Sequence, residues 1–337
     1  MKKGVGYIEH EGKAVVTNGR FAHVMAIALD PRSKYTEGVI RCITSREGDV
    51  KVKGYVDRSV LHIVHGTSLD KFTIGEPLFI RNQTEMLSQL VSTDEDFIGL
   101  EDPDIWIDEE TGLMHVYFTI PIKSSDNTKK IKTHLGHAVG TDLHSLEMTE
   151  PILIDTVLRS AKEVSIAPLN SKGFRYNLIE SRDRTSGTTY SVVMTAVAQN
   201  MGGPWEYGGI AFHPADHNIP WIGGHASPGP LLPKSFIDIG ENKLLGIING
   251  REANQKIGTE TKYGMFSIGL CIYDYELGKI DWVSKEPFIQ DSEAVTITFA
   301  SQFVETEPGK GILYAHVDDS FVRAYTLDAT EMRKLLP

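Results

Sequence analysis

Three carboxylates lie within four residues in the segment Glu101-Asp102-Pro103-Asp104, directly before a run of residues typical of a β-strand. Carboxylates this close repel one another and raise one another's pKa, which suits a proton donor. Pro103 disfavours a helix and favours an extended exit from the turn. Asp102 is therefore the first candidate for a catalytic acid, with Asp104 beside it as a substrate-binding candidate. The alternative is an ordinary acidic turn in solvent.

A second motif is Ala161–Pro168, in which Lys162 and Glu163 precede an apolar stretch. A carboxyl group in such surroundings has a raised pKa when it is buried, and the alternative is a Lys162–Glu163 pair on the surface. Cleavage of a glycosidic bond needs two carboxyl groups, about 5–5.5 Å apart for retention of configuration and about 6.5–9.5 Å apart for inversion. Equivalent positions in neighbouring units of the chain would supply such a pair from Asp102 and Glu163.

The segment Gly223–Pro230 holds His225 among glycines, which allow a ligand to approach closely. His225 is a candidate ligand of a metal ion, a phosphate or a sugar hydroxyl, and the alternative is a structural residue in a tight turn. Basic residues at the ends of expected strands are candidates for contact with carboxylate or phosphate, or else surface charges. They are Arg46, Arg58, Lys162, Arg182 and Arg251. The sequence has no His-Glu-x-x-His zinc motif, and it predicts no cofactor and no set of metal ligands.

Short runs rich in β-branched and aromatic residues, separated by Gly, Pro, Asn and Asp, make up most of the chain. They recur in units over residues 20–80, 97–155, 160–215, 220–290 and 293–328. Each unit has room for four strands, which predicts an all-β, five-bladed β-propeller of four-stranded antiparallel blades, with a two-sheet sandwich as the alternative. A hairpin over 5–17 would complete the last blade. Helices are expected only at 82–90 and 328–336, and residues 1–337 are predicted to form a single domain.

The composition excludes some classes of partner. The formal net charge is −11, which argues against nucleic acid and against an anionic membrane surface, because both need a basic face. Cys42 and Cys271 lie in apolar runs and are predicted to be buried, reduced thiols. The N-terminal residues lack the apolar core of a signal peptide, and no apolar stretch approaches the ~20 residues of a membrane span. A cytoplasmic location is therefore expected, and the sequence does not define an oligomeric state.

Several segments resemble glycoside hydrolase family 130, the β-mannoside phosphorylases and mannosidases. The segment Gly99–Ile107 is similar to the family's Gly-x-Glu-Asp-Pro-Arg-Ile motif, and Lys162–Tyr176 is similar to its Lys-Asp-Ala…Phe-Pro…Gly…Tyr pattern. Gly269–Asp274 and Gly311–Asp319 resemble later strands of the family, and Asp318 in the second of these is a substrate-binding candidate. Propeller glycosidases of family 43 are the next in resemblance, since they share the Asp-Pro and Glu openings of the blades.

The family 130 resemblance implies that Asp102 is the general acid of an inverting enzyme that acts on a short oligosaccharide, such as a β-mannoside. It also implies that Lys162 matches a phosphate-binding position of the phosphorylases. Two acids, Asp104 and Glu180, stand where the family has cations, and acids weaken an anion site by repulsion. We therefore expect hydrolysis, with Glu163 or Glu180 as the base.

Three alternatives remain open from the sequence. The first is phosphorolysis, with inorganic phosphate as a partner. In the second, a closer likeness to family 43, Glu163 becomes the acid and Asp102 tunes its pKa. The third is a propeller that binds sugar without cleaving it.

Overall fold

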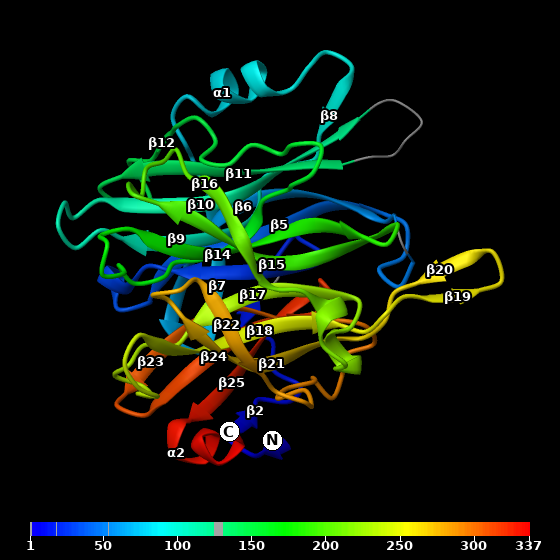
Figure 1. The fold of residues 1–337 in the computed structure, drawn as a ribbon. Coiled ribbons are helices and arrows are strands. Elements are labelled where there is room, and N and C mark those ends of the chain that lie inside the picture. The colour runs from blue at the N-terminus through cyan, green and yellow to red at the C-terminus, as the bar shows by residue number, and fades with distance from the viewer. Residues whose placement is uncertain (1, 18, 53, 125–130) are drawn as a thin grey trace.

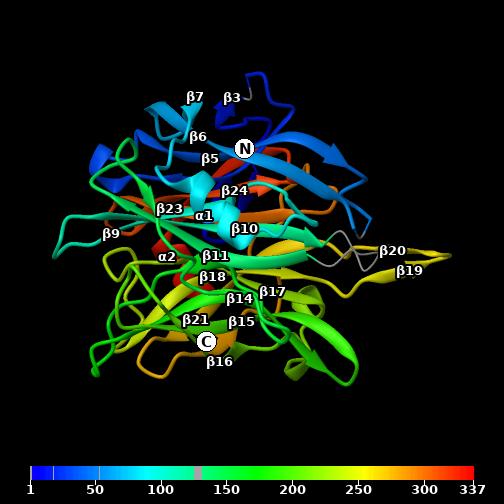
Figure 2. The same cartoon turned by 90° about the horizontal axis from the view of Figure 1, so that it is seen from above.

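The computed structural model describes residues 2–17, 19–52, 54–124 and 131–337. Strands make up most of the regular structure (Figures 1 and 2). We group their antiparallel pairs into five successive units along the chain, of which units three and four are joined into one sheet by a parallel bridge between Ser191 and His225. The prediction of an all-β chain is confirmed. Both α-helices are short, and no helix in the described ranges is long and apolar enough to cross a membrane.

The strands of each unit follow one another in antiparallel order. Unit one consists of β4 (His23–Leu29), β5 (Glu37–Glu47), β6 (Val56–Ser68) and β7 (Lys71–Pro77), with β3 (Val16–Thr17) parallel to β7. Unit two consists of β9 (Glu101–Ile107), β10 (Met114–Ser124), β11 (Ile131–Gly140) and β12 (Glu147–Met148), with β8 (Glu95–Phe97) beside β10. Unit three consists of β13 (Lys162–Ser165), β14 (Arg175–Thr185), β15 (Thr188–Ala198) and β16 (Glu206–Phe212).

The last two units carry additional strands. Unit four consists of β17 (His225–Leu231), β18 (Lys243–Arg251), β21 (Phe266–Asp274) and β22 (Lys279–Val283), and it is interrupted by the hairpin of β19 (Gln255–Ile257) and β20 (Glu260–Lys262). Unit five consists of β23 (Thr298–Glu307), β24 (Lys310–Val317), β25 (Phe321–Asp328) and β2 (Tyr7–Glu9), with β1 (Lys2–Gly4) outside β2. The β19–β20 hairpin projects from the body of the molecule in both views (Figures 1 and 2).

The fourth strands are the elements that differ most from the sequence-based prediction. In unit one the sequence pattern predicts a fourth strand at 77–80, but β7 ends at Pro77, because the chain turns tightly between Ser68 and Lys71 and residues 71–77 pair with β6. In unit two the sequence pattern predicts a fourth strand at 151–154. There Leu153 forms only an isolated bridge with Leu135, and β12 precedes it.

The helices follow the prediction closely, whereas the N-terminal segment follows it in part, because its hairpin consists of β1 and β2 rather than residues 5–17 and β3 pairs with β7 of unit one. Helix α1 covers Gln83–Leu90, and α2 covers Ala329–Met332 and continues as a 3-10 turn over Arg333–Leu335. Asp328 caps α2, since its Oδ1 accepts hydrogen bonds from the amides of Thr330 (2.9 Å) and Glu331 (3.2 Å). Strand β2 pairs with β25 and so completes unit five with residues from the other end of the chain.

Buried apolar side chains join each unit to the next. One cluster combines side chains of units one and two, such as Val39 and Val116, and others join units two and three, three and four, and four and five. A further cluster joins unit five back to unit one, through Tyr314 and Val24. The first strands repeat this cycle, because β4 contacts β9, β9 contacts β13, β13 contacts β17, β17 contacts β23, and β23 contacts β4.

A buried ion pair fixes the junction of the N-terminal segment with unit five. Arg323 of β25 is fully buried, and its Nε lies 3.0 Å from Oδ2 of Asp291. The Tyr325 hydroxyl donates to the same oxygen (2.6 Å), and Arg323 also donates to the His10 carbonyl oxygen (3.1 Å). Because the guanidinium has no access to water, its charge depends on Asp291.

We expect Asp291→Ala to lower the free energy of unfolding by about 3–5 kcal/mol, because it removes the carboxylate that is buried together with the Arg323 guanidinium and leaves only the half-exposed Glu293 to balance that charge. Urea unfolding followed by circular dichroism measures the change. Glu293→Ala is the matched control: Glu293 also pairs with Arg323 (2.8 Å) but is half exposed, so its loss should cost less than about 1 kcal/mol. Equal losses in the two variants would contradict the argument.

Candidate active site

The first strand of every unit carries a β-bulge at a corresponding position. The register shifts at Ala26 in β4, at Asp102–Pro103 in β9, at Glu163 in β13, at Gly229–Pro230 in β17 and at Ser301 in β23. Ala26, Asp102 and Glu163 have φ angles of 48°, 49° and 48°, in the left-handed region that side chains rarely adopt. Bulges re-aim side chains, and Asp102 and Glu163 are the acids among these residues.

Two cavities meet at the bulges. The residues before the bulges line a cavity of about 340 Å³, here called the charged cavity, together with side chains of the second and third strands. The residues after the bulges line a cavity of about 380 Å³, here called the acidic cavity, because its lining contains Asp104 and Glu305 but no Lys, Arg or His. Asp102 and Glu163 line both cavities, so each cavity reaches this carboxyl pair from its own side.

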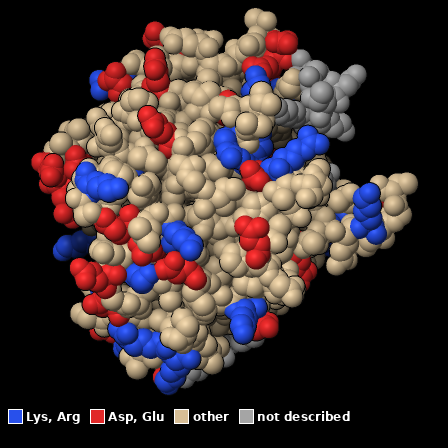
Figure 3. Space-filling view, viewed as in Figure 1, with Lys and Arg blue, Asp and Glu red and all other residues tan. Residues whose placement is uncertain are grey.

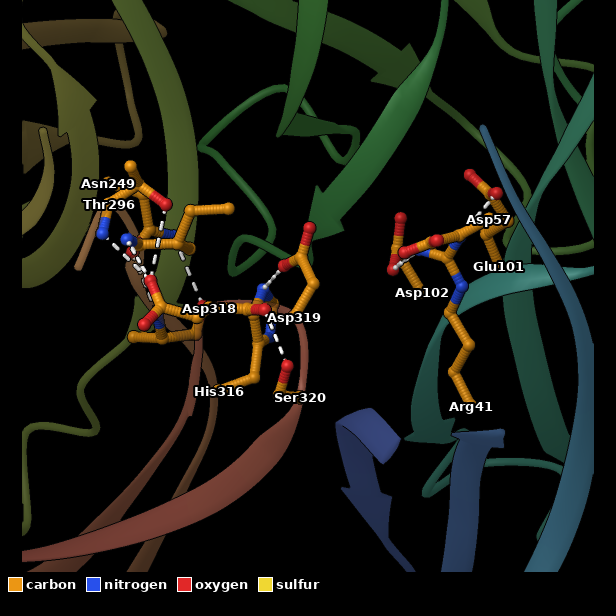
Figure 4. A network of polar contacts seen from close by, with 12 residues as sticks. Arg41, Asp57, Glu101, Asp102, Asn249, Thr296, His316, Asp318, Asp319 and Ser320 are labelled. Atoms are coloured by element: carbon orange, nitrogen blue, oxygen red, sulfur yellow. Dashed lines mark hydrogen bonds and ion pairs between the residues drawn. The ribbon is translucent and has the colours of Figure 1, made fainter. Parts of the chain in front are cut away.

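Arg41 connects unit one to the acids of unit two (Figure 4). It extends from β5, and its Nη1 lies 3.0 Å from Oδ1 of Asp102, while its Nη2 donates to Glu101. Burial opposes the charge on Arg41, but the two carboxylates outweigh burial and raise the pKa of the guanidinium. Burial raises the pKa of Glu101 to about 7, although the charge of Arg41 acts in the opposite direction.

Glu163 and Asp102 lie on neighbouring strands, line the same two cavities and are close enough to interact. Burial raises the pKa of Glu163 well above its usual value, and the negative charge of Asp102 raises it further against the opposing effect of Lys162. Both causes favour the protonated form of Glu163, which suits a proton donor.

Glu180 of β14 is surrounded by cationic and imidazole groups. Its Oε2 lies 3.0 Å from Nε2 of His225 on β17, and its Oε1 lies 3.4 Å from Nζ of Lys162. Burial alone would raise the pKa of Glu180, but His225 and Lys162 outweigh it and lower the pKa to about 2. Burial lowers the pKa of His225 despite the neighbouring Glu180, so the imidazole is neutral at neutral pH.

Arg251 of β18 brings a second fixed cation to this side of the charged cavity. Its guanidinium lies 4.2 Å from the ring centre of Tyr263 and 5.2 Å from that of Phe266. Burial lowers its pKa, and its Nε has no hydrogen-bond partner in the described structure. No carboxylate of the described residues lies within ion-pair distance of Arg251, which leaves it available to an anion.

The other side of the charged cavity is a network around Asp319 (Figure 4). Tyr55 donates its hydroxyl to Asp319 (2.6 Å), and Nε2 of His316 lies 3.2 Å from the same carboxylate. Burial would raise the pKa of Asp319, but the His316 hydrogen bond and charge and the Tyr55 hydroxyl outweigh it and lower the pKa. Asp57 lies beside this network and accepts two hydrogen bonds of 2.7 Å from Arg46. Carboxylates and a tyrosine in this arrangement suit the hydroxyl groups of a sugar.

Five of the residues singled out from the sequence line the charged cavity. They are Asp102, Lys162, Glu163, His225 and Arg251, and Glu180 contacts two of them. Arg46 lies behind the cavity wall, where it holds Asp57 and donates to the carbonyl oxygen of Asp319 (2.8 Å). Sequence reasoning missed several further lining residues: Arg41, Tyr55, Asp57, Glu101, His316 and Asp319. Arg41 had a visible signal, since a lone cation in an otherwise apolar strand needs a buried partner.

The remaining candidates lie elsewhere. Asp104 lines the acidic cavity, where burial raises its pKa to about 7. Arg58 pairs with Asp96, and Arg182 pairs with Asp155 (2.6 Å), both outside the lining of the charged cavity. Asp318 accepts hydrogen bonds from the amides of residues 295–297, at 2.8 to 2.9 Å, and so holds a turn rather than facing the cavity.

On the face shown in Figure 3, Lys and Arg are interspersed with Asp and Glu, so positive and negative charges do not form separate patches there. Cys42 and Cys271 are buried and free, as predicted.

Comparison with known proteins places this fold among carbohydrate-active enzymes. No family model matches the sequence, and no curated protein matches it. Among solved structures, β-1,2-mannobiose phosphorylase from Listeria innocua superposes with a TM-score of 0.63 at 13% identity, over 100% of this chain and 94% of the other. The chain shares its fold with these enzymes.

Two further structures support the same assignment of fold. A second structure comes from work on the GH130 family of mannoside phosphorylases, which contains glycoside hydrolases that target β-1,2-mannosidic linkages in Candida mannan. It superposes with a TM-score of 0.62 at 16% identity, over 92% of this chain and 85% of the other. A thermostable family 43 glycoside hydrolase gives 0.53 at 13% identity, over 90% and 88%. The resemblance inferred from sequence segments is confirmed at the level of the fold.

We expect Arg41→Met to lower the free energy of unfolding by about 3–5 kcal/mol at pH 8, since it leaves Glu101 and Asp102 buried without a cation. Arg41 lowers the pKa of Glu101 in the folded state, so without Arg41 the pKa of Glu101 rises further above its value in the unfolded chain. The folded variant therefore binds more protons, and its deficit shrinks as the pH falls from 8 to 5. Urea unfolding at both pH values measures this.

Arg58→Met is the matched control, because its partner Asp96 is 45% exposed. We expect it to lose less than about 1 kcal/mol, with little difference between pH 5 and pH 8. A loss in Arg41→Met that is the same at both pH values would contradict the proposed compensation.

Proposed function

We propose that the five units close into a five-bladed propeller that forms a single catalytic domain, and that this domain cleaves short oligosaccharides of the β-mannoside class by inverting phosphorolysis. The cyclic contacts of the first strands and the apolar cluster between units five and one support a closed propeller. The observation that carries the activity is the Asp102–Glu163 pair of carboxyl groups at the meeting point of two cavities. The activities named for the similar structures support a glycoside substrate, and a mannoside in particular.

The close approach of Asp102 and Glu163 argues against a hydrolase in which these two carboxyl groups serve as acid and base. The acid and base of an inverting hydrolase stand about 6.5–9.5 Å apart to admit a water molecule, whereas the charge of Asp102 acts directly on Glu163. The pair therefore supplies the acid alone, and a base for water must come from elsewhere. Glu180 is a poor choice, because a carboxylate with a pKa of about 2 that is held by His225 and Lys162 takes up a proton weakly.

Phosphate needs no such base, because it is already an anionic nucleophile. Lys162 and Arg251 contribute two fixed positive charges against the single carboxylate of Glu180, and Arg251 has no carboxylate partner. The expectation of hydrolysis rested on Asp104 and Glu180 as repelling acids. Asp104 faces the acidic cavity instead, and the negative charge of Glu180 is balanced by Lys162, so neither acid leaves an uncompensated charge against an anion beside Arg251.

In the proposed reaction the bond between the anomeric carbon and the leaving oxygen breaks as a phosphate oxygen bonds to that carbon. The Asp102–Glu163 pair donates its proton to the leaving oxygen. Hydrogen phosphate releases its own proton on forming the sugar phosphate, and the pair takes up a proton from solvent before the next turnover. The network of Tyr55, Asp57 and Asp319 would hold the sugar hydroxyls on the opposite side of the charged cavity.

We expect Asp102→Asn and Glu163→Gln each to lower kcat on manno-oligosaccharides by about 10²–10⁴-fold, because each disrupts the carboxyl pair that donates the proton. The loss should be much smaller on 4-nitrophenyl β-mannoside, whose leaving group needs little protonation. Steady-state kinetics on both substrates provides the test, with Glu147→Gln as a surface control far from both cavities. If neither variant changes turnover of any glycoside, the chain is a sugar-binding protein instead.

We expect turnover of manno-oligosaccharides to require inorganic phosphate and to yield a sugar 1-phosphate. Arg251→Met should raise the KM for phosphate about 10- to 100-fold, since a hydrogen bond to a charged group contributes about 1.5–3 kcal/mol, and should change the KM for the sugar little. Product analysis with and without phosphate checks this. Equal turnover without phosphate would replace phosphorolysis by hydrolysis.

A further inference from the structure

Two segments that are distant in the sequence meet at the wall of the charged cavity. Residues Lys51 and Val52 lie between β5 and β6 of unit one, and Lys262 and Tyr263 lie at the base of the β19–β20 hairpin of unit four. Val52 and Lys262 form an antiparallel β-bridge, and the amide of Tyr263 donates to the carbonyl oxygen of Lys51 (3.1 Å). These four residues are here called the clasp, and it spans from the first unit to the fourth.

The clasp places one aromatic ring on each side of the site. Tyr263 belongs to the clasp itself, and its ring lies 4.2 Å from the guanidinium carbon of Arg251. Tyr55 follows the Lys51–Val52 segment, and its hydroxyl donates to Asp319 (2.6 Å). The two rings pack edge to face, with centres 6.4 Å apart, and both line the charged cavity.

This arrangement links the two sides of the cavity through aromatic contacts. Arg251 has no carboxylate partner in the described structure, so its position rests on the rings of Tyr263 and Phe266. An aromatic ring beside a guanidinium carries no formal charge, so it holds the cation in place and leaves its positive charge available to an anion. The ring of Tyr263 therefore positions Arg251 without neutralising it.

We propose that the clasp is a positioning element of the active site, in which Tyr263 orients Arg251 for phosphate and Tyr55 orients Asp319 for the sugar. This inference rests on the proposed function and assigns a separate positioning role to each of the two tyrosines. It also assigns a task to the β19–β20 hairpin, whose base supplies Tyr263 while its tip extends away from the site (Figure 1).

The first experiment separates the ring of Tyr263 from its hydroxyl. Tyr263→Leu should raise the KM for phosphate roughly 3- to 30-fold, the range expected for loss of a partly desolvated cation–π contact, with the KM for the sugar unchanged. Tyr263→Phe keeps the ring and should stay within about threefold of the native value. Calorimetric titration of inorganic phosphate into the native protein and both variants gives the affinity without turnover.

The second experiment uses the other tyrosine as a matched counterpart. Tyr55→Phe removes the hydroxyl that holds Asp319, so it should raise the KM for the sugar several-fold and leave phosphate binding unchanged. We thus expect Tyr263→Leu to raise the KM for phosphate alone and Tyr55→Phe to raise the KM for the sugar alone. A native protein that neither binds phosphate nor needs it for turnover refutes the proposed function, whereas phosphate binding that is unaffected by Tyr263→Leu refutes the positioning role alone.

The third experiment decides whether the clasp stays closed. Val52 and Lys262 are antiparallel bridge partners, whose Cα separation of about 4.5–5.5 Å suits a disulfide. We expect the oxidised double variant Val52→Cys/Lys262→Cys to retain its kcat and its KM for phosphate within about threefold of the reduced form. A loss of turnover of more than tenfold on oxidation, recovered with a reductant, would make the clasp a gate and overturn the proposal.

Discussion

The site depends on the compensation of buried carboxyl groups. Glu101 and Asp102 lie on β9, and Glu163 lies on the neighbouring strand β13. Water is largely excluded from all three carboxyl groups. The positive charge of Arg41 offsets the negative charges of Glu101 and Asp102, and Lys162 adds a second positive charge beside Glu163. Burial and the charge of Asp102 raise the pKa of Glu163, which favours its protonated form. Acid chemistry at neutral pH thus follows from the way in which the fold balances buried charge.

The same principle connects the units to one another. Arg41 reaches from the second strand of unit one to the first strand of unit two, and Glu180 reaches from the second strand of unit three to His225 of unit four. Asn249 of unit four bonds the backbone of Ala300 in unit five through both its oxygen (2.8 Å) and its nitrogen (3.1 Å). Each of these side chains is buried at a junction between units, so the groups that form the site also hold the units in register.

Much of the fold could be predicted from the sequence. The spacing of strand-like runs gives the five units, because each turn is marked by Gly, Asn or Asp, as at Asn170–Gly173. The acids and bases at the first strands, such as Asp102 and Lys162, could be found from local composition. The bulges could not, since a register shift depends on the partner strand. For the same reason Asp318 and Asp319 could not be told apart, although one holds a turn and the other lines the cavity.

The ring of bulges has a consequence for how such a site can change. Ala26 has almost the same backbone angle as Asp102 and Glu163 and lines the same acidic cavity, yet it carries no functional group. The strained backbone is therefore a property of the fold and does not depend on a carboxyl side chain. A duplicated or diverging chain could move its acid among these three positions by exchanging side chains alone, because the backbone at each of them already has the left-handed conformation.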